Sequence, residues 1–243
     1  MTQSGMTLLL TRPEAQAQRF ATSCRAEISA ELPIVIAPVL RIEPRKILPD
    51  MAGVAGVVLT SENGARVLAD NAGVTGLVAW CVGDRTTQVA HELGMRAVSA
   101  GGSADELVAM VIRHAPKGAV LHVHGAKTQG DVAGRLAKAG VNATSAVIYD
   151  QIETTLSKAA VSLLQTDQTV VLPLFSPRSA RLVAAQLPKT RATLAIVALS
   201  PAVASAWRDV WTGPKPVIFT VAKHPDARHM ITEIATIWMD LSA

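Results

Sequence analysis

The sequence is poor in cysteine and in aromatic residues. Its two cysteines, Cys24 and Cys81, are too few and too far apart for a disulfide framework or a thiolate metal site. Aromatic residues make up only 3% of the 243 positions, so the stacking platforms that bind single-stranded nucleic acid are not expected. Apolar runs fall far short of the roughly 20 residues that a membrane-spanning helix needs. We therefore expect a soluble, cytoplasmic protein that binds neither nucleic acid nor membrane.

Blocks of like charge and cofactor motifs are also missing. The 23 Lys and Arg residues exceed the 19 Asp and Glu residues, giving a net charge of +4, and they are scattered along the chain. This distribution favours attraction to a small polyanion over a nucleic-acid patch. The segment 125–130 has two glycines at phosphate-loop spacing, but the Lys-Ser or Lys-Thr that must follow is absent. Since no dinucleotide fingerprint follows a predicted strand either, no cofactor is predicted.

Residues for metal-dependent or serine-nucleophile chemistry are sparse. His122 and His124 share one face of a predicted strand, which would suit a metal ion. No acidic or cysteine ligand stands close to them in the sequence, so no metal site is predicted. The Gly-x-Ser-x-Gly turn that exposes a nucleophilic serine is absent as well.

A repeated strand–turn–helix pattern organises what is present. Apolar residues make up 49% of the chain, and buried runs alternate with helical stretches, as in parallel sheets covered on both faces. One such unit runs from Val57 to Ala69, with Ser61 placed to cap its helix. The pattern returns at Ser176, 115 positions after Ser61, and Ser, Ala, Arg and a second Ala coincide at that offset.

Two further pairs of segments extend the repeat. They are Val82–Arg85 against Leu199–Ala202, and Leu8–Thr11 against Leu121–His124. The sequence therefore predicts two similar parallel-sheet α/β domains joined by a two-stranded linker, with a cleft between them. Domain one would be discontinuous, comprising residues 1–38 plus 152–243, and domain two would be inserted at residues 42–147. Residues 39–41 and 148–151 would form the linker strands.

Hydroxyl or glycine residues stand at the ends of the predicted strands. Capping hydroxyls are predicted at Thr11 (in capping-box spacing with Glu14), Ser61, Ser176 and Ser200, and glycines end strands at Gly83 and Gly125. In a parallel sheet these ends lie together, and each following helix presents free N–H groups and a partial positive charge. Such residues also begin most helices that bind nothing, so the repetition carries the prediction. The fitting ligand carries several carboxylates or phosphates.

The single tyrosine of the chain, Tyr149, ends an extended segment. A lone tyrosine is usually a packing residue with a satisfied hydroxyl group. Its position at the predicted crossing between the domains instead favours a phenol that donates a proton or a hydrogen bond. The residues alone leave both interpretations open.

Taken in order, these motifs resemble the uroporphyrinogen-III synthase family over most of the chain. The order and spacing are more specific than any single motif. The resemblance rests on Leu10–Pro13, Pro38, Leu59–Ser61, Val82–Thr86, the Gly125 loop with Leu136 and Gly140, Val147–Tyr149, Phe175–Pro177 and Pro201. The chain departs from the family at Ser200-Pro201-Ala202, where Gly-Pro-Thr is frequent, and at His124 and Gln129, where arginine is frequent.

The resemblance implies an enzyme that needs neither a metal nor a cofactor. Its substrate would be hydroxymethylbilane, a linear tetrapyrrole with eight carboxylates, and its product uroporphyrinogen III, with ring D inverted. Tyr149 matches the family's tyrosine that is proposed to assist departure of the terminal hydroxyl, and Thr86 and Ser176 match polar cleft residues. The protein would act as a monomer, with a transient contact to the enzyme that makes the bilane.

The predicted site combines the strand-end turns, three cations and the tyrosine. Substrate-binding residues would be Thr11, Arg12, Ser61, Asn63, Gly83, Thr86, Gly125, Lys127, Ser176, Arg178 and Pro201, and the catalytic residue would be Tyr149. The alternative is a non-catalytic two-domain module that binds an anionic small molecule. A glycosyl- or phosphoryl-transfer enzyme would need an acidic metal motif, which the sequence lacks.

Overall fold

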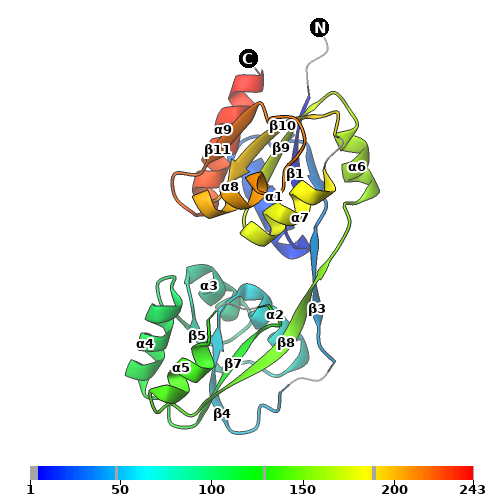
Figure 1. Cartoon of the computed structure of the whole chain (residues 1–243). Helices are drawn as coiled ribbons and strands as arrows, with labels where there is room; N and C mark the ends of the chain where they lie inside the picture. The colour runs from blue at the N-terminus through cyan, green and yellow to red at the C-terminus, as the bar shows by residue number, and fades with distance from the viewer. Residues whose placement is uncertain (1–4, 47–48, 128–129, 188–189, 243) are drawn as a thin grey trace. The chain divides into compact units, whose positions relative to one another are not determined.

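The structure is a computed structural model that describes residues 5–46, 49–127, 130–187 and 190–242. Its strands are β1 (Met6–Leu10), β2 (Ile34–Ile36), β3 (Leu40–Pro44), β4 (Val54–Leu59), β5 (Val78–Cys81), β6 (Arg96–Ser99), β7 (Ala119–Gly125), β8 (Ala143–Glu153), β9 (Thr169–Leu174), β10 (Thr193–Ala198) and β11 (Ile218–Val221). Its helices are α1 (Glu14–Glu27), α2 (Glu62–Asn71), α3 (Asp84–Glu92), α4 (Ala104–His114), α5 (Val132–Lys138), α6 (Lys158–Leu164), α7 (Pro177–Gln186), α8 (Pro201–Arg208) and α9 (Ala227–Ser242). Figure 1 labels these elements along the chain.

The chain divides into two compact units. Unit 1 comprises Met1–Arg41 and Glu153–Ala243, and unit 2 comprises Ile42–Ile152. The divisions fall inside β3 and β8, so strand residues make both connections. These two strands are hydrogen-bonded neighbours. The Arg45 N–H donates to the Ile148 carbonyl over 2.9 Å.

The two sheets have the same strand order, position by position. Unit 1 has the order β2-β1-β9-β10-β11, and unit 2 has β8-β7-β4-β5-β6 with β3 added beside β8. Neighbouring strands within these two five-strand series are parallel. Strand β4 therefore matches β9, β5 matches β10, and β7 matches β1, which are the three segment pairs of the sequence repeat. The predicted fold class of two similar parallel α/β domains is confirmed.

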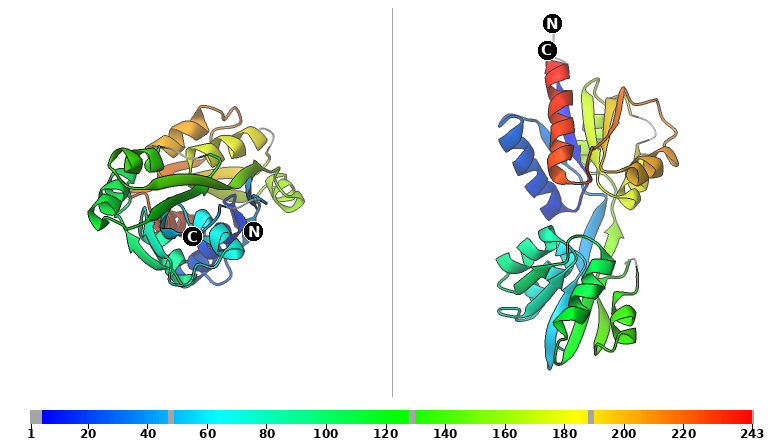
Figure 2. Two further views of the ribbon diagram at one scale, coloured as in Figure 1. Left: turned by 90° about the horizontal axis from the view of Figure 1, so that it is seen from below. Right: turned by 90° about the vertical axis from the view of Figure 1, so that its left-hand side faces the viewer.

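Helices cover both faces of each sheet, which explains why the strands read as continuous apolar runs. In unit 1, α1 and α9 pack on one face and α6, α7 and α8 on the other. The right-hand view of Figure 2 separates these two helical layers. In unit 2, α2 and α3 cover one face, and α4 and α5 cover the other. Strand β9 shows the consequence most clearly, because all six of its residues are buried.

Serine side chains begin most of the helices that follow the strands. Ser61, Ser103, Ser176 and Ser200 each accept a hydrogen bond from a backbone N–H three residues later. This bond satisfies one of the N–H groups that the first turn of a helix leaves without a partner. Throughout the part of the chain that the structure describes, no helix has both the length and the apolar character required to cross a membrane.

Candidate active site

The candidate residues of unit 1 lie where its strand order changes direction. From β1 the chain passes through α1 to β2 on one side, and from β9 it passes through α7 to β10 on the other. Since β1 and β9 are neighbours, their carboxyl ends form the position at which open α/β sheets bind ligands. Arg12 follows β1, and Ser176 and Arg178 follow β9.

Unit 2 has the corresponding position between β4 and β7. Helix α2 leads from β4 to β5, and α5 leads from β7 to β8, on opposite faces of the sheet. Ser61 and Asn63 follow β4, while Gly125 ends β7 and Lys127 follows it. Tyr149 joins them from β8, because the register pairs it with Gly125.

Tyr149 is a buried residue whose ring packs directly against Gly125. Its exposed fraction is 4%, and the ring belongs to the apolar core between the sheet and α2 and α3. A Cβ atom added at Gly125 would lie 2.5 Å from Tyr149 Cε2. Burial raises the pKa of the phenol above its usual value, and hydrogen bonding with Ser61 and the Gly125 backbone partly opposes this rise. The phenol is therefore neutral at physiological pH.

Ser61 connects the tyrosine to the start of α2. Its Oγ lies 3.0 Å from the Tyr149 hydroxyl oxygen and accepts the Gly64 N–H over 3.3 Å. The two hydroxyl-bearing residues are 88 positions apart in the sequence. The structure thus brings together two residues that the sequence analysis assigned to different roles.

In unit 1 the equivalent turn is built from a serine pair and two arginines. Ser176 accepts the Ser179 N–H over 3.2 Å, and its Oγ lies 2.6 Å from the Ser179 hydroxyl. The Arg12 guanidinium lies 4.0 Å from the centre of the Phe175 ring, a favourable cation–π arrangement. Arg178 forms an ion pair with Glu153 at 3.0 Å.

Thr11 does not cap the first helix, and this prediction is wrong. Helix α1 has Pro13 at its N-cap position and no side-chain capping bond. Thr11 instead directly follows β1, is buried, and accepts the Val39 N–H with its carbonyl oxygen over 3.2 Å. The carboxylate of Glu14 accepts a hydrogen bond from Gln18 rather than closing a capping box. Since proline has no N–H, one orphan donor of a helix start is absent.

The ends of β5 and β10 offer fewer groups than predicted. Gly83 has the extended backbone of the N-cap of α3, but Thr86 is buried in the first turn of that helix. Pro201 is the first residue of α8, and Ser200 accepts the Val203 N–H over 3.4 Å. Because proline lacks an N–H, a ligand at this turn would have to use the neighbouring backbone.

One acidic residue of the site was missed by the sequence analysis. Glu62 follows Ser61 directly, is buried, and has its carboxylate 3.7 Å from Arg85 Nε. An acidic residue in a first helical turn is the signal that could have revealed it. Helix α7 has no acidic residue in its first turn, so the N-terminus of α7 offers a more positive potential to an incoming carboxylate than that of α2 does.

The histidine pair noted in the sequence, His122 and His124, forms a polar cluster next to Gly125 on β7. The His122 and His124 rings lie 4.7 Å apart, and His122 Nε2 lies 3.4 Å from Thr60 Oγ1. His124 Nδ1 donates to the Gly125 carbonyl over 2.8 Å, which helps to fix that turn. Among the residues that the structure describes, no group of three or more His, Cys, Asp or Glu side chains could hold a metal ion. Thr128 and Gln129 of the glycine loop lie outside those residues.

The buried His122 predicts a pH-dependent stability. Burial and the neighbouring His124 lower the pKa of His122 from 6.5 to about 4, against the opposing effect of Asp131. Between these values the unfolded chain binds a proton at this imidazole and the folded chain does not, so stability falls as pH falls. The loss from pH 7 to pH 4 should be about 3 kcal/mol.

Urea unfolding at a series of pH values measures this effect. His122→Gln should flatten the curve between pH 6.5 and 4, whereas the exposed His91, replaced in the same way, should leave it as in the parent. An unchanged slope in His122→Gln would contradict the assignment of the effect to this buried imidazole.

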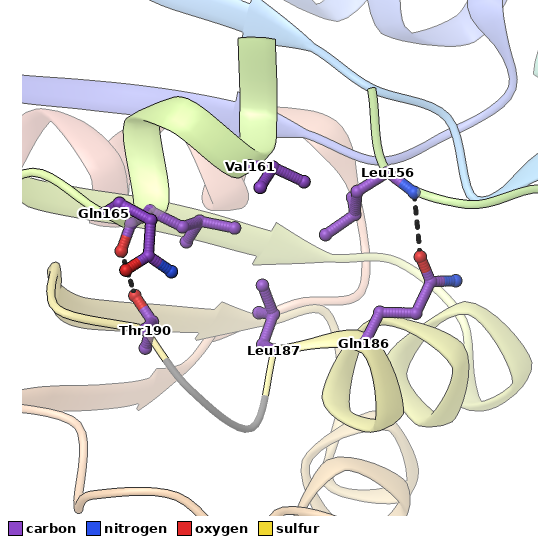
Figure 3. A pocket seen from close by; sticks show the side chains of 7 residues that line it. Leu156, Val161, Gln165, Gln186, Leu187 and Thr190 are labelled. Atoms are coloured by element: carbon purple, nitrogen blue, oxygen red, sulfur yellow. Dashed lines mark hydrogen bonds between the residues drawn. The ribbon is translucent and has the colours of Figure 1, made fainter. Parts of the chain in front are cut away.

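Two cavities of unit 1 lie near the amino ends of its strands, whereas the candidate residues follow the carboxyl ends. The cavity in Figure 3 has a volume of 190 Å³ and lies where α6 and α7 end. Its polar groups are engaged internally: the Leu156 N–H donates to Gln186 Oε1 over 2.8 Å, and the Thr190 hydroxyl donates to the Leu164 carbonyl over 2.8 Å. A second cavity, of 370 Å³, lies beside Trp211, between α8 and β11. Neither cavity includes a candidate residue.

Both cysteines are unsuited to covalent chemistry. Burial raises the pKa of the Cys24 thiol to about 12 and that of Cys81 to about 11. A thiolate, which is the nucleophilic form, is therefore scarce at physiological pH.

Comparisons with known proteins identify the family. The family model described as uroporphyrinogen-III synthase HemD matches residues 28–232. The crystal structure of uroporphyrinogen-III synthetase from Helicobacter pylori 26695 has a TM-score of 0.65 and 11% identity, covering 96% of this chain and 99% of that one. A mutant uroporphyrinogen III synthase from the extremely thermophilic bacterium Thermus thermophilus has a TM-score of 0.48 and 13% identity, covering 97% and 99%. No curated protein matches the chain.

The Helicobacter pylori structure supports the fold, and the family model supports the activity. That model spans most of the chain, from the end of α1 into α9, and includes the ends of β4, β7 and β9. The chain belongs to the uroporphyrinogen-III synthase family and catalyses the cyclisation of hydroxymethylbilane to uroporphyrinogen III.

Proposed function

We propose that the chain inverts ring D by folding the bilane through its carboxylates, with Tyr149 supplying a proton to the departing hydroxyl. One observation carries this proposal: the single tyrosine of the chain lies against Gly125 and Ser61, at the ligand-binding edge of the unit 2 sheet.

Backbone N–H groups and a few cations would hold the carboxylates. The first turns of α2 and α7 retain N–H groups besides those bonded to Ser61 and Ser176. Arg12 and Lys127 would add positive charge, as would Arg178 beside Glu153. Lys127 is exposed and carries a flexible point charge, whereas the Arg12 guanidinium is held against the Phe175 ring. Arg12 would therefore be more selective for the position of a bound carboxylate.

The reaction depends more on how the bilane is positioned than on strong acid–base catalysis. Loss of the terminal hydroxyl gives an azafulvene, and attack by the substituted carbon of ring D gives a spiro intermediate. Fragmentation and reclosure then leave ring D inverted. Unaided, the bilane closes without inversion, so holding the chain in the folded shape decides the product. A neutral phenol can assist the first step as a hydrogen-bond or proton donor.

We further propose that the protein works as a cytoplasmic monomer. The bilane closes spontaneously, so a transient contact with the enzyme that produces it would shorten the time the substrate spends free. The net charge of +4 would assist capture of a polyanionic substrate in either case.

Separation of the porphyrin isomers tests the function directly. Enzymatically made hydroxymethylbilane is incubated with the protein, and the oxidised products are resolved by chromatography against a protein-free control. Type III product is expected to dominate at protein concentrations far below that of the substrate. Exclusive formation of type I, the unaided product, would leave only the alternative of a non-catalytic module that binds an anion.

A further inference from the structure

We propose that the Ser61 hydroxyl donates the proton to the leaving hydroxyl of the bilane. Tyr149 then replaces that proton by donating its own to Ser61 Oγ. The inference rests on the proposed role of Tyr149 and reverses the roles predicted from the sequence. There Ser61 was a carboxylate-binding residue, and Tyr149 contacted the reacting atoms.

Burial places the two hydroxyl groups in this order. Tyr149 is 4% exposed and packed into the core beside α2 and α3. Gly125 leaves no gap over the ring, since even a single added carbon there would lie 2.5 Å from it. Ser61, in contrast, is only half-buried. It stands at the end of β4, on the edge where ligands bind to parallel sheets.

The hydrogen bonds of Ser61 leave its proton available. A serine hydroxyl can accept two hydrogen bonds and donate one. Ser61 Oγ accepts the Gly64 N–H over 3.3 Å and lies 3.0 Å from the Tyr149 oxygen. Either hydroxyl could donate in this pair, and we assign the donor role to Tyr149 because a phenol is more acidic than an aliphatic alcohol. Both acceptor positions of Ser61 are then occupied, and its own hydrogen remains for a ligand.

The proton balance of the reaction closes through this pair. As the C–O bond of the terminal hydroxymethyl group breaks, the Ser61 proton passes to the departing oxygen, forming water. The Tyr149 proton moves to Ser61 Oγ and leaves a phenolate. The substituted carbon of ring D then attacks the azafulvene carbon and forms one C–C bond, and fragmentation of the spiro intermediate breaks the original C–C bond to that ring carbon. Reclosure forms a second C–C bond at the unsubstituted carbon of ring D, and the proton that this carbon releases restores the phenol. The sum is bilane to macrocycle plus one water.

A purely structural role for Ser61 would make it one of several equivalent helix caps. Ser103 caps α4 in the same unit, accepts the Glu106 N–H over 3.1 Å, and bonds to Glu106 rather than to tyrosine. Ser103→Ala is therefore the matched control, because it removes a serine cap without touching the site.

Three replacements of Ser61 separate the hydroxyl from the cap. Ser61→Ala removes both, while Ser61→Gly removes the hydroxyl and keeps most of the capping preference. Ser61→Thr keeps both. We expect kcat for type III product to fall about 10²-fold in the first two variants, with KM changed less. In Ser61→Thr and Ser103→Ala we expect it to stay within a few-fold of the parent.

The double variant decides between a shared and a separate action. If the two hydroxyls form one relay, Ser61→Gly combined with Tyr149→Phe should be no slower than the slower single variant. A normal Ser61→Gly beside an impaired Tyr149→Phe would overturn this inference and keep the proposed function. A normal Tyr149→Phe would instead refute the proposed role of the tyrosine itself.

A spectroscopic readout shows whether the hydrogen bond exists in solution. Because the chain has one tyrosine, the absorbance change on phenol ionisation reports Tyr149 alone. In the ionised state the phenolate oxygen would accept the Ser61 hydrogen, and this hydrogen bond lowers the pKa of Tyr149. Ser61→Gly should therefore raise that pKa, while Ser103→Ala leaves it as in the parent. An identical titration in Ser61→Gly and the parent would overturn the assignment.

Discussion

Replacement of Tyr149 by phenylalanine is expected to lower kcat for type III product by about 10²-fold, because one proton donor is lost from the first step. The phenylalanine ring fills the same space against Gly125, so only the hydroxyl disappears. KM should change little, since the turns that we propose to bind the carboxylates are untouched. Initial rates with freshly made hydroxymethylbilane, corrected for spontaneous closure, provide the measurement.

The matched control for this variant is Ser145→Ala. Ser145 is an exposed residue of the same strand, β8, and takes no part in the site. It should retain the parent rate and stability. If Tyr149→Phe also keeps the parent kcat while remaining folded, the tyrosine is a packing residue, which is the other interpretation of its sequence position.

The repeat in the sequence was enough to predict the architecture. Ser61 and Ser176 are 115 positions apart, and the structure places both at helix starts after equivalent strands, β4 and β9. Such patterns are local: a buried run, a capping serine and a helical spacing are each visible within about a dozen residues. The weaker pairs Val82–Arg85 and Leu8–Thr11 also fall on equivalent strand ends.

Contacts between distant segments could not be predicted in this way. Nothing local places Ser61 Oγ 3.0 Å from Tyr149, because that distance depends on the order of β4, β7 and β8 in the sheet. The burial of Thr86 and of Glu62 depends likewise on packing. The prediction that Thr11 caps α1 was wrong for a different reason. Its spacing to Glu14 is that of a capping box, but the intervening Pro13 sets its own backbone angle and starts the helix later.

The close packing of the Tyr149 ring against Gly125 also could not be predicted, because nothing in the sequence around Gly125 indicates it. Gly125 was predicted as a glycine that ends a strand and binds substrate, and the structure shows that it is buried. Its φ lies outside the left-handed region, so backbone conformation does not require glycine there. The requirement comes from the ring of Tyr149, contributed by the next strand.

Gly125→Ala is therefore expected to destabilise unit 2 and to impair catalysis together. The new Cβ would lie 2.5 Å from Tyr149 Cε2 and 2.7 Å from Cζ, and the ring is packed into the core of unit 2. Overpacking of this kind costs about 1–3 kcal/mol. Displacement of the phenol from Ser61 should also lower kcat, because proton transfer requires hydrogen-bond distance. Urea unfolding and the isomer assay measure the two effects.

Gly73→Ala is the matched control, since an added Cβ at Gly73 meets nothing within 4 Å. It should leave both stability and rate near those of the parent. Combining Gly125→Ala with Tyr149→Leu removes the aromatic ring that the new methyl group would strike. That double variant should be less destabilised than the sum of its single changes, because the clash exists only when both groups are present. Strict additivity would mean that the ring does not press on Gly125, and the geometry of the site would then need another explanation.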